Sequence, residues 1–363
     1  MKKITSMILA LVFAVSLIGS ASAKTLKIQL TFPKTSYDGQ IVKMWTDRVT
    51  KLTRGELKFE LLSKGEVVGL KETLEAVDKG LVDGGAAWTH YWSNYHPAAM
   101  LFGSPVAGGG IGLSTKSWLA WYFDNGGMEL YDQLWDEMGM NVKGFVMASS
   151  GPEALGWFKE PINSMADFRK YRFRTPPGIP GQTYKDIGVA SVSMGGGDIL
   201  PALEKGTIDA AEWCCPKPDL VFGFQKVLKN YYLQGLHQNV VNGDVFFNKD
   251  VYNKLSKQEK YAMEIASEAM ITRNITNRAV ENGKALIELT SKHGVILHDT
   301  PADYFVEYMA AAKATIQKNS KENKFFDEVY QHMTAHAKIV VPFIAQMETS
   351  DASIGTAFAK AQK

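Results

Sequence analysis

Cysteine is almost absent from this chain: its 363 residues include only two, Cys214 and Cys215, and they are adjacent. A disulfide framework of the kind that stabilises many small secreted domains is therefore excluded. A disulfide between the two neighbours would close no useful loop and would be strained. We interpret the pair as two small, half-buried thiols.

An excess of charge of one sign is also lacking, because 40 basic and 38 acidic side chains leave a net charge of +2. Nucleic-acid-binding surfaces need a basic stripe, and funnels for acidic substrates need a strong positive field. The balanced charge argues against both, so we expect no nucleic-acid partner.

No apolar run reaches the roughly 20 residues that a membrane-spanning helix needs. The N-terminus has the pattern of a cleavable signal peptide over residues 1–23 instead. Two lysines precede a short apolar run, and small residues follow it at the expected cleavage site: Lys2, Lys3, the run from Met7 to Ile18, and Ala21-Ser22-Ala23. We predict that the mature chain is exported to a bacterial periplasm.

The short motifs of common enzyme classes are missing. The chain has no HExxH zinc motif, GxSxG nucleophile elbow, paired CxxC or Walker phosphate loop. His332 and His336 have the i,i+4 spacing of half a metal site, but no Glu follows the first histidine. We interpret these two as a polar helix face, and we expect no enzymatic activity.

One stretch does occur twice. Residues 202–209 (ALEKGTID) align with residues 76–83 (AVDKGLVD) with identical Ala, Lys, Gly and Asp positions. In each copy a short helical pattern runs into a glycine, which ends helices readily, and a strand-forming pair follows. A helix–Gly–strand unit used twice predicts two similar α/β lobes that bring strand ends to a common cleft.

Strand and helix patterns alternate along the first half of the chain, which favours mainly parallel sheets with helices on both faces. A capping box at Ser256 and Glu259 begins a helix that we expect to reach Lys292. At 1.5 Å per residue it would be on the order of 50 Å long and could brace both lobes. More helices are predicted to the end of the chain.

A few polar and aromatic residues stand at predicted strand ends, where ligands bind in such sheets. Arg174 ends one strand, and a guanidinium group matches a carboxylate with two parallel N–H groups. Glu212 follows the strand of the second repeat. Tyr91 and Trp92 follow the strand of the first repeat, and we expect them to line the ligand pocket.

Longer segments resemble one known family. The secretion signal, the paired units and the segment FRKYRFRTPPG (residues 168–178) are similar to periplasmic solute-binding proteins of TRAP (tripartite ATP-independent periplasmic) transporters, the C4-dicarboxylate-binding-protein-like family. GPEALGWF (151–158), IDAAEWCCP (208–216) and the segment 237–248 are most similar to the branch that binds α-keto acids and lactate. The resemblance covers essentially the whole mature chain.

The resemblance implies the fold and the site. It implies a two-lobed periplasmic binding protein, each lobe a mixed, mostly parallel sheet flanked by helices. Arg174 would form a bidentate salt bridge with the ligand carboxylate. Glu153, Glu212, the Trp213 backbone carbonyl and Asp244 would surround a cation that the ligand helps to hold.

The chain departs from the branch at position 153, where a neutral Gln is usual and this sequence has Glu. If Glu153, Glu212 and Asp244 converge, like charges 4 Å apart cost about 4 kcal/mol per pair at an effective dielectric of 20. A monovalent ion offsets this poorly, which leaves a divalent ion or a raised carboxyl pKa. Oxygen ligands with a flexible coordination number favour Ca²⁺, with Na⁺ as the alternative.

These inferences give a receptor that closes on a pyruvate-like 2-oxo or 2-hydroxy monocarboxylate and delivers it to the membrane subunits of a TRAP transporter. The alternative is an exported metal-dependent enzyme acting on a keto acid. Apolar residues at helical spacing beyond Phe325, together with the resembling branch, suggest a homodimer formed through C-terminal helices. The predicted division of the chain is a signal peptide at 1–23, lobe I at 24–147 and about 238–275, lobe II at 148–237 and about 276–330, and a helical extension at 331–363.

Overall fold

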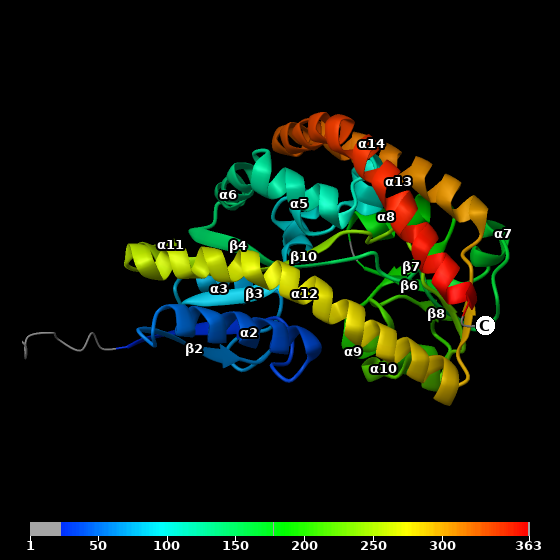
Figure 1. The fold of residues 1–363 in the computed structure, drawn as a ribbon, viewed down its shortest axis with the longest axis horizontal. Coiled ribbons are helices and arrows are strands. Elements are labelled where there is room, and N and C mark those ends of the chain that lie inside the picture. Colours follow the sequence, from blue (N-terminus) through cyan, green and yellow to red (C-terminus); the bar gives the residue numbers. More distant parts are fainter. Residues whose placement is uncertain (1–22, 177, 362–363) are drawn as a thin grey trace, which may run out of the picture.

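The computed structural model describes residues 23–176 and 178–361 and contains two mixed β-sheets (Figure 1). The first sheet has the strand order β2-β1-β3-β10-β4 and the second β11-β9-β5-β8-β6-β7. The strands of the first sheet are β1 (Lys24–Leu30), β2 (Leu57–Leu62), β3 (Gly84–Trp88), β4 (Val142–Ser150) and β10 (Val241–Asn248). Those of the second are β5 (Gly156–Phe158), β6 (Arg172–Thr175), β7 (Ala190–Ser193), β8 (Ala210–Ala211), β9 (Asn230–Tyr232) and β11 (Ile296–His298).

Both sheets combine parallel and antiparallel pairs. In the first, β1 pairs in parallel with β2 and β3, whereas β10 runs antiparallel between β3 and β4. In the second, β6 pairs in parallel with β7 and β8, while β5 runs antiparallel to β8 and β9. The predicted α/β class is confirmed, and β10 carries the chain back into the first sheet after most of the second has formed.

Helices flank both sheets and fill the C-terminal part. They are α2 (Tyr37–Leu52), α3 (Thr73–Asp78), α4 (Ala99–Gly103), α5 (Thr115–Asp124), α6 (Gly127–Glu137), α7 (Met165–Phe168), α8 (Ile179–Asp186), α9 (Gly196–Glu204), α10 (Pro216–Phe222), α11 (Lys249–Asn253), α12 (Lys257–Lys292), α13 (Ala302–Glu322) and α14 (Lys324–Ala361). Short 3-10 helices are η1 (Thr89–Asn94), η2 (Val106–Gly110) and η3 (Phe224–Lys226).

The repeated unit has the same structure in both sheets. Helices α3 and α9 are followed by Gly80 and Gly206, whose φ angles are 69° and 65°. This left-handed conformation suits glycine because a Cβ atom would be strained there. The chain then enters β3 of the first sheet and β8 of the second. The repeat thus places Glu212, the residue after β8, at the end of a buried strand in the second sheet.

Helix α12 connects the two halves (Figure 1). It begins with the predicted capping box, in which Ser256 accepts from the Glu259 amide and the Glu259 side chain accepts from the Ser256 amide. The 36-residue helix packs against α2 and β4 of the first half and against α10 of the second. It ends at Lys292 as predicted, and it braces both halves.

The predicted signal peptide lies outside the described residues apart from its last position. Among the helices that the structure describes, none is long and apolar enough to cross a membrane. The division into lobes at the residues given above stays a prediction.

Candidate functional site

A cavity of about 70 Å³ lies between the two halves. Each half supplies part of its wall. Asp38, Trp88, His90 and Tyr91 come from the first half, and Arg174, Trp213 and Cys214 from the second. Glu153 follows β4, where the chain crosses from one sheet to the other, and Arg278 comes from the middle of α12.

Three buried groups converge beside this cavity, and one of them, Glu153, lines it. One ligand atom each from Glu153, Glu212 and His237 lies within 4.8 Å of the other two. Within the described residues, Glu153 Oε2, Glu212 Oε2 and His237 Nε2 have no hydrogen-bond partner. Buried polar atoms are nearly always paired in folded proteins, so three unpaired atoms at one place indicate a site for a cation or a polar ligand.

The electrostatics of this cluster favour a bound cation. Burial raises the pKa of Glu153 well above its usual range, and the neighbouring Glu212 carboxylate raises it further. Two carboxylates within one coordination shell suit a hard cation such as calcium, which binds oxygen ligands in flexible numbers. The residues present therefore fit the predicted cation.

Arg174 is buried beside the cluster at the C-terminal end of β6. Its Nη1 atom donates to Glu212 Oε1 at 2.5 Å and to the Glu212 backbone carbonyl at 2.9 Å. Nε and Nη2 donate to the Met194 carbonyl at 3.2 and 3.0 Å. The Arg174 side chain also lies 5.3 Å from the Trp213 ring centroid, a cation–π contact. A ligand carboxylate would have to replace some of these protein partners.

Aromatic residues of the first half complete the wall. Tyr91 lines the cavity, as does His90. Burial lowers the pKa of His90 to about 4, although the Glu212 carboxylate opposes the shift, so this imidazole is neutral at pH 7. The two rings meet edge to face with centroids 5.0 Å apart. The cavity therefore contains Arg174, Glu153, Trp213 and Tyr91 of the predicted ligand-binding residues.

Asp244 lies elsewhere, and this corrects the predicted convergence of three acids. It is on β10, and its Oδ2 atom accepts from Thr89 at 2.9 Å and from Tyr131 at 2.8 Å. Both donors belong to the first half. Burial raises the pKa of Asp244 to about 7. The β10 register turns this side chain into its own half, and His237 takes the third place in the cluster.

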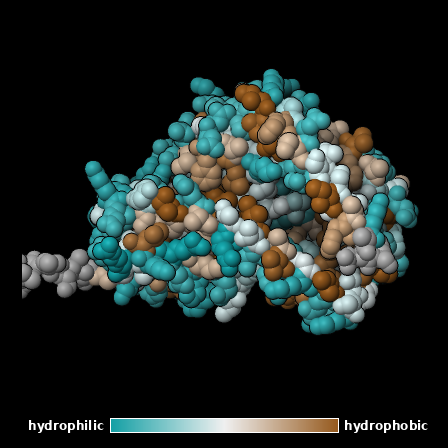
Figure 2. Space-filling view, viewed as in Figure 1, coloured by the Kyte–Doolittle hydropathy of each residue, from teal (hydrophilic) through white to brown (hydrophobic). Residues whose placement is uncertain are grey.

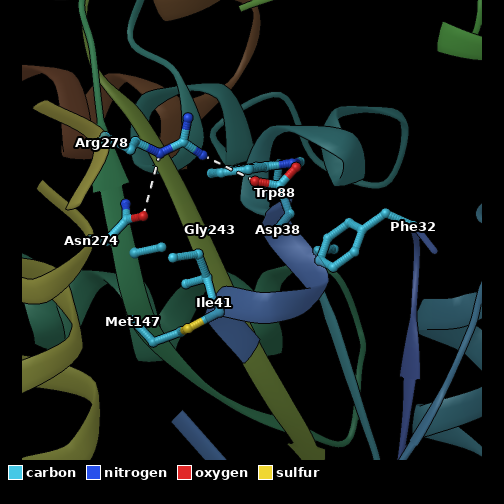
Figure 3. Close-up of a pocket in the computed structure, with 10 residues that line it drawn as sticks. Phe32, Asp38, Ile41, Trp88, Met147, Gly243, Asn274 and Arg278 are labelled. Atoms are coloured by element: carbon cyan, nitrogen blue, oxygen red, sulfur yellow. Dashed lines mark hydrogen bonds and ion pairs between the residues drawn. The ribbon is translucent and has the colours of Figure 1, made fainter. Parts of the chain in front are cut away.

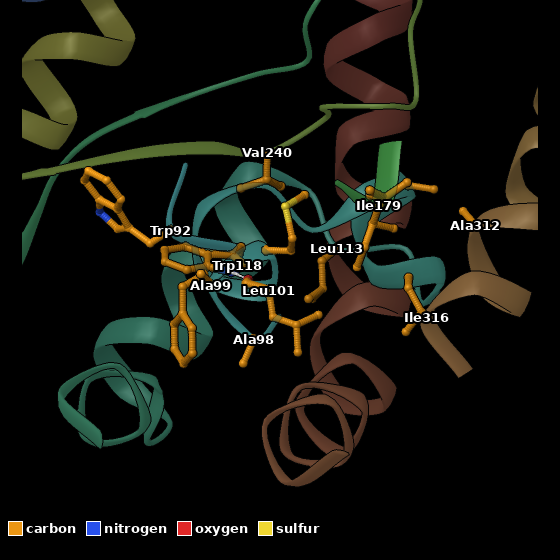
Figure 4. Close-up of a cluster of buried hydrophobic side chains, with 14 of the residues drawn as sticks. Trp92, Ala98, Ala99, Leu101, Leu113, Trp118, Ile179, Val240, Ala312 and Ile316 are labelled. Carbon is orange, nitrogen blue, oxygen red and sulfur yellow. Dashed lines mark hydrogen bonds between the residues drawn. The ribbon is translucent and has the colours of Figure 1, made fainter. Parts of the chain in front are cut away.

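Trp92 is also away from the cavity wall. It is 1% exposed and its ring packs edge to face on Phe246, with centroids 5.7 Å apart. Figure 4 shows it in a cluster of buried apolar side chains that includes Trp118 and Leu101. Because η1 is helical, successive residues point in different directions, so Tyr91 faces the cavity while Trp92 faces the core.

Sequence reasoning missed Arg278. This residue projects from α12, and its Nη2 atom donates to Asp38 Oδ1 of α2 at 3.0 Å (Figure 3). Its Nε atom donates to Asn274 Oδ1 at 3.3 Å. The guanidinium group also lies 5.8 Å from the Trp88 ring centroid. No motif marks Arg278, because it is one of many charged residues on a long helix.

A comparison with protein families decides the identity of the fold. The sequence profile of the DctP family, described as bacterial extracellular solute-binding protein family 7, matches residues 30–323. The chain belongs to this family. It is 30% identical over 298 residues to a monocarboxylate 2-oxoacid-binding periplasmic protein of Nostoc sp., with 80% of this chain and 78% of that protein covered.

Solved structures of family members have the same architecture. A TRAP transporter solute-binding protein of Bordetella bronchiseptica, a dimer with copurified calcium and picolinate in its active site, superposes with a TM-score of 0.85 at 25% identity, covering 93% of this chain and 99% of that one. A protein of Colwellia psychrerythraea with bound calcium and pyruvate gives 0.83 at 22% identity, covering 92% of this chain and 99% of that one. One from Pseudoalteromonas atlantica with sodium and pyruvate gives 0.83 at 21%, covering 91% and 99%. At these lower identities the likeness establishes the two-lobed fold.

Proposed function

We propose that this DctP-family protein is the extracytoplasmic receptor of a TRAP transport system and binds a small 2-oxo or 2-hydroxy monocarboxylate together with a cation. The observation that carries the proposal is that Arg174 and Glu153 line one cavity, while Glu212 and His237 lie directly beside Glu153 and offer atoms that make no hydrogen bond within the described part of the chain. The arginine supplies a carboxylate anchor, and the acids supply ligands for a metal ion. Relatives that bind 2-oxoacids, or hold pyruvate with calcium, support this choice.

In the proposed complex Arg174 holds the ligand carboxylate, with Trp213 and Tyr91 against the organic part. Glu153, Glu212 and the Trp213 backbone carbonyl would bind the cation. The 2-oxo or 2-hydroxy oxygen of the ligand, next to its carboxylate, would be a further ligand of the cation. Glu212 can serve both partners, because Oε1 accepts from Arg174 while Oε2 accepts no hydrogen bond within the described residues. His237 Nε2, 3.5 Å from Glu212 Oε2, would donate to a ligand oxygen.

Calcium is the proposed cation. Charges of the two acids and the ligand carboxylate sum to −3, and Arg174 brings the total to −2. A calcium ion neutralises this total, whereas sodium leaves −1 in a cavity that closure of the two halves shields from water. With Gln at position 153, which is usual in the resembling branch, the cation would have one negative charge fewer to neutralise, and sodium would be favoured.

The proposed receptor has no catalytic cycle, and incubation of pure protein with pyruvate and Ca²⁺ separates it from a metal-dependent enzyme. We expect calorimetric binding of one pyruvate per chain and recovery of unchanged pyruvate after denaturation. Turnover of pyruvate would support the enzyme instead, and absence of any binding heat would contradict the proposed ligand class.

Delivery requires a membrane partner, which for this family is a TRAP transporter, so we place the mature protein in the periplasm.

We also propose a homodimer. Helix α14 packs Val329 and Met333 into its own chain but leaves an apolar stripe in solvent (Figure 2). The stripe consists of Ile339, Phe343, Met347, Ile354 and Phe358, each at least 56% exposed. The spacing of four and seven residues puts them on one helix face.

Replacing two stripe residues should dissociate the dimer. We expect Phe343→Ser combined with Phe358→Ser to give the mass of one chain in light scattering, because each serine removes a large apolar contact. Val306→Ser on α13 is a matched control, since Val306 is 72% exposed but outside the stripe. A single-chain mass for the unsubstituted protein would show that this helix has no partner copy.

A further inference from the structure

The two cysteines lie in the wall of the ligand cavity. Cys214 lines it beside Glu153 and Arg278. The Cys214 and Cys215 sulfurs are 2.8 Å apart, and both side chains are free thiols that are 8% exposed. The sequence-based interpretation was two small, half-buried thiols; the structure buries both of them further, and the interpretation does not explain why their sulfurs lie so close together.

The Arg278 side chain contacts both sulfurs. Its Nη1 atom lies 3.4 Å from Cys214 Sγ and 3.6 Å from Cys215 Sγ, while Nη2 bonds Asp38. A guanidinium group at this distance compensates negative charge on a sulfur that acts as a nucleophile. The dithiol therefore has both the close approach and the charged neighbour that sulfur–sulfur bond formation requires.

The backbone around the cysteines is tied to the binding residues. The Cys214 carbonyl accepts from the Ala154 amide at 2.8 Å, directly after Glu153. The Cys214 amide donates to Asp219 Oδ1 at 3.1 Å, and the Cys215 carbonyl accepts from the Asp219 amide at 3.0 Å. Any rotation of the peptide between the cysteines would disturb Glu153 on one side and α10 on the other.

We propose that Cys214 and Cys215 form a reversible disulfide that lowers the ligand affinity of the cavity under oxidising conditions. The effect on affinity rests on the proposed function, whereas formation of the bond does not. An extracytoplasmic location exposes the pair to oxidants from which cytosolic thiols are protected.

A peroxide is sufficient as the oxidant. One sulfur attacks a peroxide oxygen and becomes a sulfenic acid as the O–O bond breaks and water leaves. The second sulfur then attacks the sulfenic sulfur, the S–S bond forms, and a second water leaves. The pair loses two electrons and two protons, and the peroxide is reduced to two waters.

The bond should be easily reversed. Adjacent Cα atoms are about 3.8 Å apart across a trans peptide, whereas disulfides usually join Cα atoms about 4.4–6.8 Å apart. Closing the bond must therefore strain or rotate the peptide between the cysteines. A strained disulfide is more readily reduced, which suits a switch rather than a structural link.

The test uses the purified full-length mature protein, treated with hydrogen peroxide, with and without later dithiothreitol. Alkylation in denaturant followed by intact mass measurement shows whether the thiols are bonded, and no other cysteine in the chain can contribute. We expect both thiols to be protected after peroxide and free after dithiothreitol. Calorimetry should show pyruvate binding with Ca²⁺ weakened roughly tenfold, the effect of losing about one good hydrogen bond, and restored on reduction.

The matched control is Cys214→Ser combined with Cys215→Ser, which keeps every methionine of the mature chain and so reports oxidation elsewhere. Serine is a favourable residue at position 215, the N-cap of α10. We expect peroxide to leave pyruvate affinity of this variant unchanged. Three results would overturn the proposal. They are alkylation of both thiols after peroxide, a disulfide between two chains, and an intramolecular disulfide that leaves pyruvate affinity unchanged. If the reduced protein bound no pyruvate, the proposed function would fail while the mass result still decided whether the bond forms.

Discussion

Removing bound metal should weaken pyruvate binding by roughly 100-fold, near the upper end of the coupling free energies between two sites. The reason is electrostatic. Without a cation, a ligand carboxylate would enter a cavity that Glu153 lines, with Glu212 next to Glu153 and both side chains almost fully buried. Calorimetric titration of pyruvate after exhaustive chelation measures the loss, and Ca²⁺ should restore binding better than Na⁺ at equal ionic strength.

Position 153 provides the sharpest variant for this experiment. Glu153→Gln removes one negative charge, so the preference for Ca²⁺ over Na⁺ should fall. Glu66→Gln makes the same chemical change at an exposed acid and should leave the preference unaltered. Because burial raises the pKa of Glu153, calcium must also displace a proton from it, and calcium affinity of the unsubstituted protein should rise with pH. Identical pyruvate titrations with and without chelation would show that these acids hold no metal.

The second large effect is expected at Arg174. Arg174→Lys keeps the charge but loses the planar pair of N–H donors, so pyruvate affinity should fall by roughly tenfold or more, as for a lost charged hydrogen bond. Arg172→Lys is the matched control, because Arg172 lies two residues away on β6 and pairs with Asp209 in solvent. Calorimetry on the two variants should show a loss only for Arg174→Lys.

The structure adds a stability effect that sequence reasoning did not expect. Arg174 and Glu212 form a buried ion pair, so Arg174→Met leaves an uncompensated carboxylate and should lower the free energy of unfolding by roughly 3–5 kcal/mol. Combining it with Glu212→Gln should recover much of this loss in a double-mutant cycle measured by urea denaturation. Additive losses from the two single variants would contradict a direct coupling between the side chains.

Local sequence signals predicted much of the fold. The repeated helix–Gly–strand unit requires a left-handed glycine after each helix, and Gly80 and Gly206 have that conformation. The capping box at Ser256 correctly predicted where α12 begins. The strand pattern also predicted that Arg174 and Glu212 stand at strand ends, and the structure makes these ends neighbours because β6 and β8 pair in parallel.

Parts of the site depend on contacts between distant segments, which local patterns do not encode. His237 reaches the two acids from the connection before β10, and Arg278 reaches the cavity from the middle of α12. The prediction that Asp244 lies with Glu153 and Glu212 was wrong for a related reason. Strand side chains alternate between faces, and the register of β10 against β3 directs this acid toward Tyr131 instead of the cavity.

Native mass spectrometry of protein purified without added ligand tests most directly whether one carboxylate and one cation occupy the cavity together. We expect each chain to carry one calcium ion and one small 2-oxo or 2-hydroxy monocarboxylate, and to lose both after chelation. A bare chain that stays bare when pyruvate and Ca²⁺ are added, or a copurified ligand without a carboxylate, would contradict the proposed site.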